Sequence, residues 1–258
     1  KGVKQITLCV GGSATNDAGT GMLSALGIKF LDDTGKVFIP TGGTLKKIHE
    51  IDDRELINSN DVNFTIISDV DNVLYGFNGA AYVYGPQKGA NESTVHQLDL
   101  GLRHFAEKVY LKYGINLQSI KGGGAGGGIV SGASFFLKAQ VQPGIDVLLN
   151  LANFDQLCQE ADLVFTGEGK IDYQTSNGKA IHGIAKRTKK YNVPLIAIVG
   201  DIGEGYEQAI ENGVTAVFSI NRKAMSFHDS RHMSKDNLKI TMMNVLNLIE
   251  RLIAKEDH

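Results

Sequence analysis

Short runs of apolar, often β-branched residues recur along the chain and stop abruptly at glycine or polar residues. Such runs are typical of buried strands, because a strand covered on both faces carries apolar side chains at successive positions. We expect strands at residues 6–10, 62–67, 163–166, 194–199 and 216–220. In the second half of the chain these runs alternate with helical patterns, which predicts a doubly wound, mostly parallel, Rossmann-like α/β sheet.

The longest helical pattern covers residues 92–113, where apolar side chains recur three and four positions apart. This spacing puts them on one face of an amphipathic helix that packs on the core. Further helices are predicted at residues 129–139, 146–151, 178–190, 205–211 and 229–255, with a short one that ends at Gly27.

The middle of the chain has a different pattern. Residues 28–39 are two short apolar runs around an Asp-Asp-Thr-Gly turn, which predicts a hairpin, and residues 80–84 are expected to form another strand. We therefore predict a second, smaller α/β lobe at residues 25–116. Residues 1–24 and 117–258 would form the Rossmann-like domain, with a ligand cleft between the two lobes.

Composition and charge narrow the classes of function. Among 258 residues, 26 basic and 28 acidic side chains give a net charge of −2, so no global field attracts nucleic acid or an anionic membrane. No apolar run approaches the roughly 20 residues of a membrane-spanning helix, and no signal peptide precedes the first strand, so we expect a cytoplasmic protein. Cys9 and Cys158 lack metal or redox spacing and are interpreted as reduced packing residues.

A glycine-rich loop follows the first predicted strand. Residues 11–19 read GGSATNDAG. Glycines allow close backbone approach to an anion, the N–H groups at the start of the next helix favour negative charge, and Ser13 and Thr15 add hydroxyl donors. The same pattern fits a tight turn capped by Asp17. An anion site and a capped turn both remain open.

Two further loops carry charged side chains. Residues 68–72, SDVDN, follow a predicted strand, so Asp69 and Asp71 could activate a hydroxyl or hold hydrated Mg²⁺, or could simply cap an Asx turn. Residues 85–89, GPQKG, contain Lys88. Lys88 is either a solvated loop cation or a phosphate partner, and the pattern alone favours the solvated cation.

Residues 122–128, GGGAGGG, contain the spacing G-x-G-x-x-G. The dinucleotide fingerprint also needs a preceding strand, and residues 116–121 are a poor strand, so a backbone cradle for another ligand fits better than NAD. The sequence has no G-x-x-x-x-G-K-[ST], G-x-S-x-G or H-E-x-x-H motif, which argues against standard P-loop, serine-hydrolase and zinc-protease sites.

A fourth segment, residues 166–172, reads TGEGKID and is expected to be a loop after the strand at residues 163–166. A cation, two carboxylates and two glycines at the carboxyl end of a parallel strand would suit a phosphoryl or carboxylate site. The alternative is a surface salt bridge between Lys170 and Asp172.

Taken together, five motifs in this order and spacing resemble those of bacterial glycerate kinases: residues 11–17, 68–72, 85–90, 143–146 and 166–172. The resemblance implies ATP-dependent phosphorylation of D-glycerate, at its 2-hydroxyl, with Mg²⁺, in glyoxylate metabolism. It also implies a two-lobed α/β protein with its site in the cleft.

On this resemblance and on the chemistry of phosphoryl transfer, we assign Asp69 and Lys170 as catalytic candidates and Asp71 as the metal candidate. Asp69 would orient or deprotonate the hydroxyl of glycerate, and Lys170 with Mg²⁺ would offset the charge of the γ-phosphate. The candidates for substrate and phosphate binding are Gly11, Gly12, Ser13, Thr15, Asn16, Asp17, Lys88, Gly124, Glu168, Gly169 and Asp172.

The sequence departs from the family at its beginning. Family members start with a further segment that contains an Asp-Ser-Phe-Lys and a later Asp-Gly-Gly-Glu-Gly-Thr motif, and this chain has neither. We expect the carboxyl-terminal part of a glycerate kinase. Its expected partners are D-glycerate and ATP, with a homodimer as a hypothesis and with neither nucleic acid nor membrane. The alternatives are an anion- or nucleotide-binding module without turnover, and a dehydrogenase built on the loop at residues 122–128.

Overall fold

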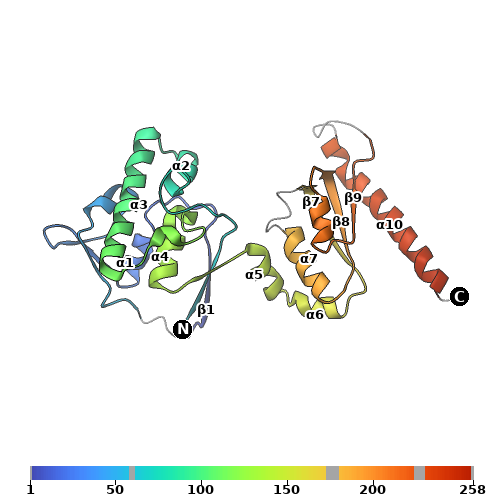
Figure 1. Cartoon of the computed structure of the whole chain (residues 1–258), viewed down its shortest axis with the longest axis horizontal. Helices are drawn as coiled ribbons and strands as arrows, with labels where there is room; N and C mark the ends of the chain where they lie inside the picture. The colour runs from blue at the N-terminus through green and yellow to red at the C-terminus, as the bar shows by residue number, and fades with distance from the viewer. Residues whose placement is uncertain (1, 58–61, 173–179, 224–229, 257–258) are drawn as a thin grey trace. The chain divides into compact units, whose positions relative to one another are not determined.

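The computed structural model describes residues 2–57, 62–172, 180–223 and 230–256. The chain divides into two compact units, an N-terminal unit (Lys1–Gly144) and a C-terminal unit (Ile145–His258). Each unit is built on a parallel sheet that carries helices, so the predicted α/β class is confirmed (Figure 1). Within the described residues, no helix combines the length and the apolar character needed to cross a membrane.

The N-terminal unit contains a three-stranded parallel sheet in the order β1-β5-β6, formed by β1 (Gln5–Cys9), β5 (Asn63–Ile67) and β6 (Gln140–Gln142). In its register Cys9 lies opposite Ile67. Because both strands run in the same direction, the loops that follow them leave the sheet side by side. This edge of the sheet carries the first two motifs.

A second, antiparallel sheet in the order β3-β2-β4 contains the predicted hairpin. Its strands are β2 (Lys29–Leu31), β3 (Val37–Phe38) and β4 (Glu50–Asp52), of which β4 was not predicted. The ring of Phe30 packs edge-on against Phe105 with centroids 6.4 Å apart, and both side chains are fully buried. The hairpin therefore shares one core with the long helix.

The helices of this unit are α1 (Thr20–Ala25), α2 (Ala80–Tyr84), α3 (Glu92–Tyr113) and α4 (Ile129–Phe136), with short 3₁₀ turns η1 (Gly42–Lys47), η2 (Pro86–Lys88), η3 (Leu117–Ser119) and η4 (Ala125–Gly128). The predicted helix at residues 92–113 is confirmed. It begins after Asn91, whose side chain accepts the N–H of Thr94 at 2.9 Å, and ends at Gly114 in a left-handed conformation.

The C-terminal unit has a parallel sheet in the order β7-β8-β9, formed by β7 (Val164–Ile171), β8 (Leu195–Ile202) and β9 (Ala216–Ser219). Its helices are α5 (Gly144–Leu151), α6 (Phe154–Gln159), α7 (Ala180–Lys190), α8 (Glu207–Glu211) and α10 (Ser234–Glu256), with the turn η5 (Arg231–Met233). Alternate side chains of β8 pack into two different hydrophobic clusters. Ala197 packs with α7, and Ile198 packs with Val245 of α10. Helices therefore cover both faces of this sheet, as Figure 1 shows.

Two predicted elements were wrong. Residues 80–84 form helix α2 instead of a strand, because a five-residue apolar run fits either state and here Ala80 and Ala81 pack into the core. Residues 166–171 continue β7 instead of forming a loop, since they pair with β8. Glycine permits this pairing at close range: a Cβ on Gly200 would lie 2.4 Å from the carbonyl oxygen of Gly169.

Smaller differences concern the ends of elements. Helix α4 stops at Phe136 and is followed by the unpredicted strand β6, and helix α6 was also missed. The compact units differ from the predicted lobes as well. The strand at residues 63–67 pairs with β1, so it belongs with the first strand and not with the hairpin alone. That residues 1–24 and 117–258 form one domain stays a prediction.

Candidate functional site

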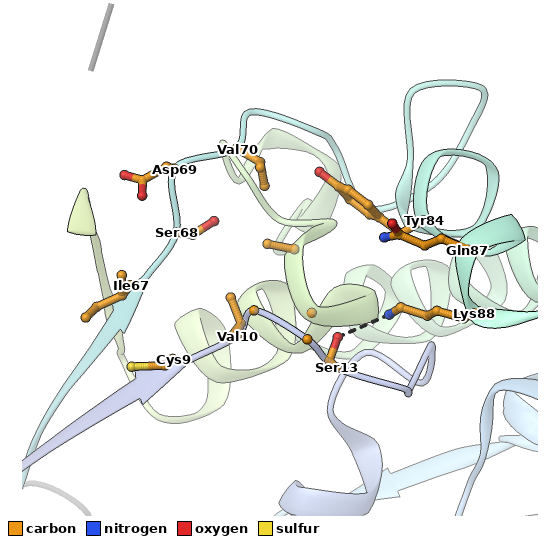
Figure 2. A pocket seen from close by; sticks show the side chains of 14 residues that line it. Cys9, Val10, Ser13, Ile67, Ser68, Asp69, Val70, Tyr84, Gln87 and Lys88 are labelled. Atoms are coloured by element: carbon orange, nitrogen blue, oxygen red, sulfur yellow. Dashed lines mark hydrogen bonds between the residues drawn. The ribbon is translucent and has the colours of Figure 1, made fainter. Parts of the chain in front are cut away.

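A cavity of about 640 Å³, which we call the first cavity, lies at the carboxyl ends of β1 and β5 in the N-terminal unit (Figure 2). Carboxyl ends of parallel strands are where doubly wound proteins bind ligands. The loops after the two strands, the end of α2, the turn η2 and the glycine-rich turn η4 supply its walls. The residues that line it are Cys9, Val10, Gly11, Gly12, Ser13, Ile67, Ser68, Asp69, Val70, Tyr84, Gln87, Lys88, Ala125 and Gly126.

The cationic wall of the first cavity is built around Lys88. Its ammonium donates to the hydroxyl oxygen of Ser13 at 3.1 Å and to the carbonyl oxygen of Thr15 at 2.7 Å. Burial lowers the pKa of Lys88, and the nearby charge of Asp17 opposes this shift. Within the described chain, Lys88 has no carboxylate at ion-pair distance. Lys88 is therefore a half-buried, anchored cation facing the cavity, in contrast to the solvated loop cation that the pattern favoured.

The glycines of the first loop leave the approach to this cation open. A Cβ built on Gly11 or on Gly12 would meet nothing within 4 Å, and Gly12 adopts a positive φ of 69°. Ser13 lies beside them, with its hydroxyl toward Lys88 in Figure 2. Gly11, Gly12, Ser13 and Lys88 are thus brought together, in an arrangement that can accommodate an anionic group.

The second half of the same loop is occupied by its own hydrogen bonds. The carboxylate of Asp17 accepts the N–H groups of Gly19 and Gly21, both at 3.1 Å, and the hydroxyl of Thr15 at 2.5 Å. The alternative of a turn capped by Asp17 is therefore correct for these residues. The chain uses both functions of the motif, a capped turn at Asp17 and an open backbone at Gly11 and Gly12.

The remaining residues of this loop line a separate cavity of about 450 Å³, which we call the second cavity. It is lined by Ala14, Thr15, Asn16, Asp17, Thr41, Gly42, Gly43, Gly85, Lys88, Gly89, Ala90, Thr94 and Leu98. The side chain of Asn16 is buried, and its amide has no hydrogen-bond partner among the described residues. Thr15, Asn16 and Asp17 thus line the second cavity and not the first, whereas Lys88 lines both.

The carboxylate wall of the first cavity is formed by Asp69. Its carboxylate accepts the N–H of Gly144 at 3.0 Å. Figure 2 shows Asp69 on the side opposite Ser13 and Lys88, with its carboxylate turned away from them. A ligand in the cavity would therefore meet the ammonium of Lys88 at one end, while Asp69 lies at the other end with its carboxylate directed away from Lys88.

Asp71 does not line the first cavity. Its side chain is 77% exposed and forms an ion pair with Lys121, which is 81% exposed, at 3.2 Å. Such an exposed pair contributes little to stability because water screens it. The two acidic residues of the motif therefore differ: Asp69 lines the first cavity, and Asp71 does not.

The segment at residues 122–128 acts as a support under both loops. The N–H of Gly124 donates to the carbonyl oxygen of Asn72 at 2.9 Å, and the carbonyl oxygen of Gly127 accepts the N–H of Ala18 at 3.0 Å. A Cβ on Gly124 would lie 2.2 Å from the carbonyl oxygen of Val73. Gly124 is thus occupied by packing and does not line either cavity.

The dinucleotide interpretation of this segment is contradicted by what precedes it. The turn η3, and not a strand, comes before residues 122–128. The fingerprint requires a strand that delivers the glycines to a helix N-terminus. The dehydrogenase alternative is therefore dropped.

Four predicted site residues lie in the C-terminal unit. Glu168, Gly169 and Lys170 are part of strand β7, and Asp172 follows it. The ammonium of Lys170 is 3.5 Å from the carboxylate of Asp172, so the predicted salt bridge is present, with the Lys170 side chain 54% exposed. Their participation in a common site with Asp69 stays a prediction.

Sequence reasoning missed Tyr84 and Gln87, which line the first cavity beside Lys88. The hydroxyl of Tyr84 donates to the side-chain oxygen of Asn72 at 2.6 Å, and burial raises its pKa. Both residues stand within four positions of Lys88. A helical interpretation of residues 80–88 would have placed them on the same short segment.

The sequence pattern that defines the glycerate kinase family matches residues 1–250. The chain belongs to the glycerate kinase family. The family resemblance carried by the five motifs is therefore confirmed.

Several members of the family resemble the chain over most of its length. The glycerate kinase of Halalkalibacterium halodurans is 43% identical over 95% of this chain, and that of Bacillus cereus is 39% identical over 100%. The glycerate 2-kinase of Escherichia coli is 35% identical over 95%. The chain spans 65%, 68% and 64% of the lengths of these three glycerate kinases.

A crystal structure described as a putative glycerate kinase 2, from Salmonella typhimurium, matches the fold with a TM-score of 0.77 and 33% identity. The match covers 97% of this chain and 65% of that one. The α/β architecture of the chain is thus that of a glycerate kinase.

Proposed function

We propose that the chain is part of an ATP-dependent glycerate kinase that transfers a phosphoryl group to the 2-hydroxyl of D-glycerate and forms 2-phosphoglycerate. The first cavity supports the proposal, since the anchored cation Lys88 and the acidic residue Asp69 both line it. Membership of the glycerate kinase family supports the reaction. The name of the E. coli relative, glycerate 2-kinase, supports the 2-hydroxyl as acceptor.

In this proposal the two walls of the first cavity have different roles. The Lys88 ammonium, the Ser13 hydroxyl and the open backbone of Gly11 and Gly12 hold an anionic group, either the carboxylate of glycerate or a phosphate. Asp69 orients the hydroxyl and accepts its proton as the bond to phosphorus forms. Phosphoryl transfer needs mainly positioning and charge neutralisation, and this division provides both.

We propose further that Glu168, Gly169, Lys170 and Asp172 contribute from the C-terminal unit, with Lys170 offsetting negative charge on the γ-phosphate of ATP. Their place at the carboxyl half of the parallel strand β7 supports this, because ligands of such sheets bind at that edge. Thr15, Asn16 and Asp17 keep a supporting role in the loop.

In the N-terminal unit, Mg²⁺ would be held by one or two carboxylates together with the substrate. The described residues contain no group of three or more His, Cys, Asp or Glu side chains that could enclose a metal ion. Mg²⁺ in kinases is held by one or two carboxylates together with substrate phosphates and water. Asp69 and the solvent-facing Asp71 would supply such carboxylates, and a bound Mg²⁺ would neutralise phosphate charge.

The test is turnover of D-glycerate and ATP, measured by coupled ADP release, in the full-length protein that contains this chain and in its Asp69→Asn variant. The amide oxygen of asparagine can still accept the N–H of Gly144, so the loop keeps its bond, but the proton acceptor is lost. We expect kcat to fall by about 10²-fold or more. Phosphorus NMR of the product distinguishes 2-phosphoglycerate from 3-phosphoglycerate.

The matched control is Asp33→Asn, which removes the same charge at an exposed hairpin turn and should leave kcat unchanged. Near wild-type turnover of Asp69→Asn would remove Asp69 from its role. A folded chain that binds phosphate but releases no ADP with D-glycerate would favour the alternative, a binding module without turnover.

We propose a cytoplasmic enzyme of organic-acid metabolism, in glyoxylate metabolism, that acts as a homodimer. Light scattering of the purified protein, which gives its molar mass in solution, tests the dimer directly.

A further inference from the structure

Tyr84 connects the two walls of the first cavity. It is the last residue of α2, and its side chain lines the cavity between Val70 and Gln87 in Figure 2. The phenol hydroxyl donates to the side-chain oxygen of Asn72, in the loop that carries Asp69, at 2.6 Å. Burial raises the pKa of Tyr84, so the phenol keeps the proton that makes this bond.

Asn72 transmits this contact to the backbone of its loop. Its side-chain NH₂ donates to the carbonyl oxygen of Asn78 at 3.1 Å, and its own carbonyl oxygen accepts the N–H of Gly124 at 2.9 Å. With Tyr84 as the third partner, the residue is held from three directions. A shift of the phenol would therefore displace Asn72, which is three residues from Asp69 in the same loop.

Lys88 is linked through the backbone to Tyr84, the other partner of the hydrogen bond with Asn72. Helix α2 and turn η2 share Gly85, whose N–H donates to the carbonyl oxygen of Ala81 and whose carbonyl oxygen accepts the N–H of Lys88, both at 2.9 Å. A Cβ on Gly85 would lie 2.3 Å from the carbonyl oxygen of Ala81, so this link is closely packed. Tyr84 and Lys88 therefore belong to one continuous helical segment.

Among the described residues, few other side-chain contacts hold the tip of the Asp69 loop. Asp71 pairs with the exposed Lys121, and Val70 is partly exposed to solvent. Asp69 itself is tied to Gly144 on the side away from Lys88. The hydrogen bond between Tyr84 and Asn72 thus links the cationic wall to the carboxylate wall across the cavity.

We infer that Tyr84 is a positioning residue, which sets the separation between Asp69 and Lys88 through Asn72 without itself taking part in the chemistry. This inference rests on the proposed function in one respect, since the separation matters to a substrate that contacts both walls. A displacement of about 1 Å in a reacting group can lower a rate by as much as about 10²-fold.

The test compares the wild type with Tyr84→Phe, which removes one hydroxyl and keeps the ring, and with Asn72→Ala. We expect each variant to lower kcat at least about tenfold, while KM for D-glycerate stays within about twofold. Because both variants break the same link, Tyr84→Phe combined with Asn72→Ala should be little worse than either alone. Tyr82→Phe is the matched control on the same helix, because Tyr82 does not line the cavity and its hydroxyl lies 3.4 Å from His96.

A second measurement does not depend on turnover. Hydrogen exchange of the backbone amides at residues 69–73 should be faster in Tyr84→Phe and unchanged in Tyr82→Phe. Wild-type exchange in Tyr84→Phe would overturn the inference, and so would an unchanged kcat in an active chain. If the full-length protein that contains this chain shows no turnover, the proposed function fails, and the exchange rates still decide whether Tyr84 positions the loop.

Discussion

Two glycine-rich segments of the N-terminal unit have similar composition and opposite roles. In the loop at residues 11–19, a Cβ added to Gly11 or to Gly12 would meet no atom within 4 Å, and both residues border the first cavity. In the segment at residues 122–128, Gly124 and Gly127 would place a Cβ 2.2 Å and 2.0 Å from backbone carbonyl oxygens. The first segment leaves space for a ligand, and the second has filled that space with protein.

The packed segment supports the loops that border the first cavity. The packed glycines let residues 122–128 come close enough to donate and accept hydrogen bonds with both ligand loops, at Asn72 and at Ala18. The open glycines can then remain exposed, because their loop is supported from below. Glycine content by itself shows only that something lies close to the backbone.

Among the variants considered, Gly127→Ala should destabilise the protein most. The new Cβ would lie 2.0 Å from the carbonyl oxygen of Thr15, at a φ of 69° that alanine disfavours. We expect a loss of about 3 kcal/mol or more in the free energy of unfolding, because neither backbone segment can move without breaking the support. Urea denaturation followed by circular dichroism measures it.

Gly11→Ala is the control for that prediction, since its Cβ meets no atom and its φ is not positive. Its free energy of unfolding should stay within about 0.5 kcal/mol of the wild type. Similar losses for the two variants would mean that the distinction between open and packed glycines is wrong.

Lys88 tests whether the open segment binds an anion. Replacing it by methionine should weaken phosphate binding about tenfold, as expected for a lost charge-assisted hydrogen bond. Because burial lowers the pKa of Lys88, the affinity should also decline with rising pH before the ordinary lysine value of 10.5 is reached. Calorimetric titration with phosphate across this pH range measures both effects.

Rising pH should change the stability of the protein in the opposite direction from its affinity for phosphate. Between the lowered pKa of folded Lys88 and 10.5, the unfolded chain holds more protons, so the free energy of unfolding rises with pH in that window. Lys88→Arg keeps its charge and should lose the pH dependence of phosphate binding. The same decline in Lys88→Arg would assign the dependence to another group.

The smallest effect concerns two serine hydroxyls beside the packed segment. Ser131 is fully buried and donates to the carbonyl oxygen of Gly123 at 3.0 Å, whereas the buried hydroxyl of Ser68 has no partner among the described residues. Ser131→Ala should lower the free energy of unfolding by about 1 kcal/mol, and Ser68→Ala should leave it equal or slightly higher. Thermal unfolding of both variants compares them, and a larger loss in Ser68→Ala would reveal a missing partner.

Much of the fold could be predicted because local patterns were long or distinctive. The 22-residue helix α3 shows its apolar face in the sequence, and the apolar runs that contain strands β1 and β5 stop at Gly11 and at Ser68. Short or glycine-containing segments could not be predicted in this way. Helix α2 has only five residues, and β7 continues through two glycines because β8 pairs with it.

For the site, the sequence determined which chemical groups are available: Asp69 after a strand, open glycines with Ser13, and Lys88 in a loop. The tertiary structure decided which of them meet. Asp17 caps a turn through its hydrogen bonds, and Gly124 is packed against the backbone of a neighbouring loop. The pairing of β1 with β5 brings Asp69 and Ser13 to one cavity. These outcomes depend on contacts between residues distant in the chain, which a local pattern of residue types does not record.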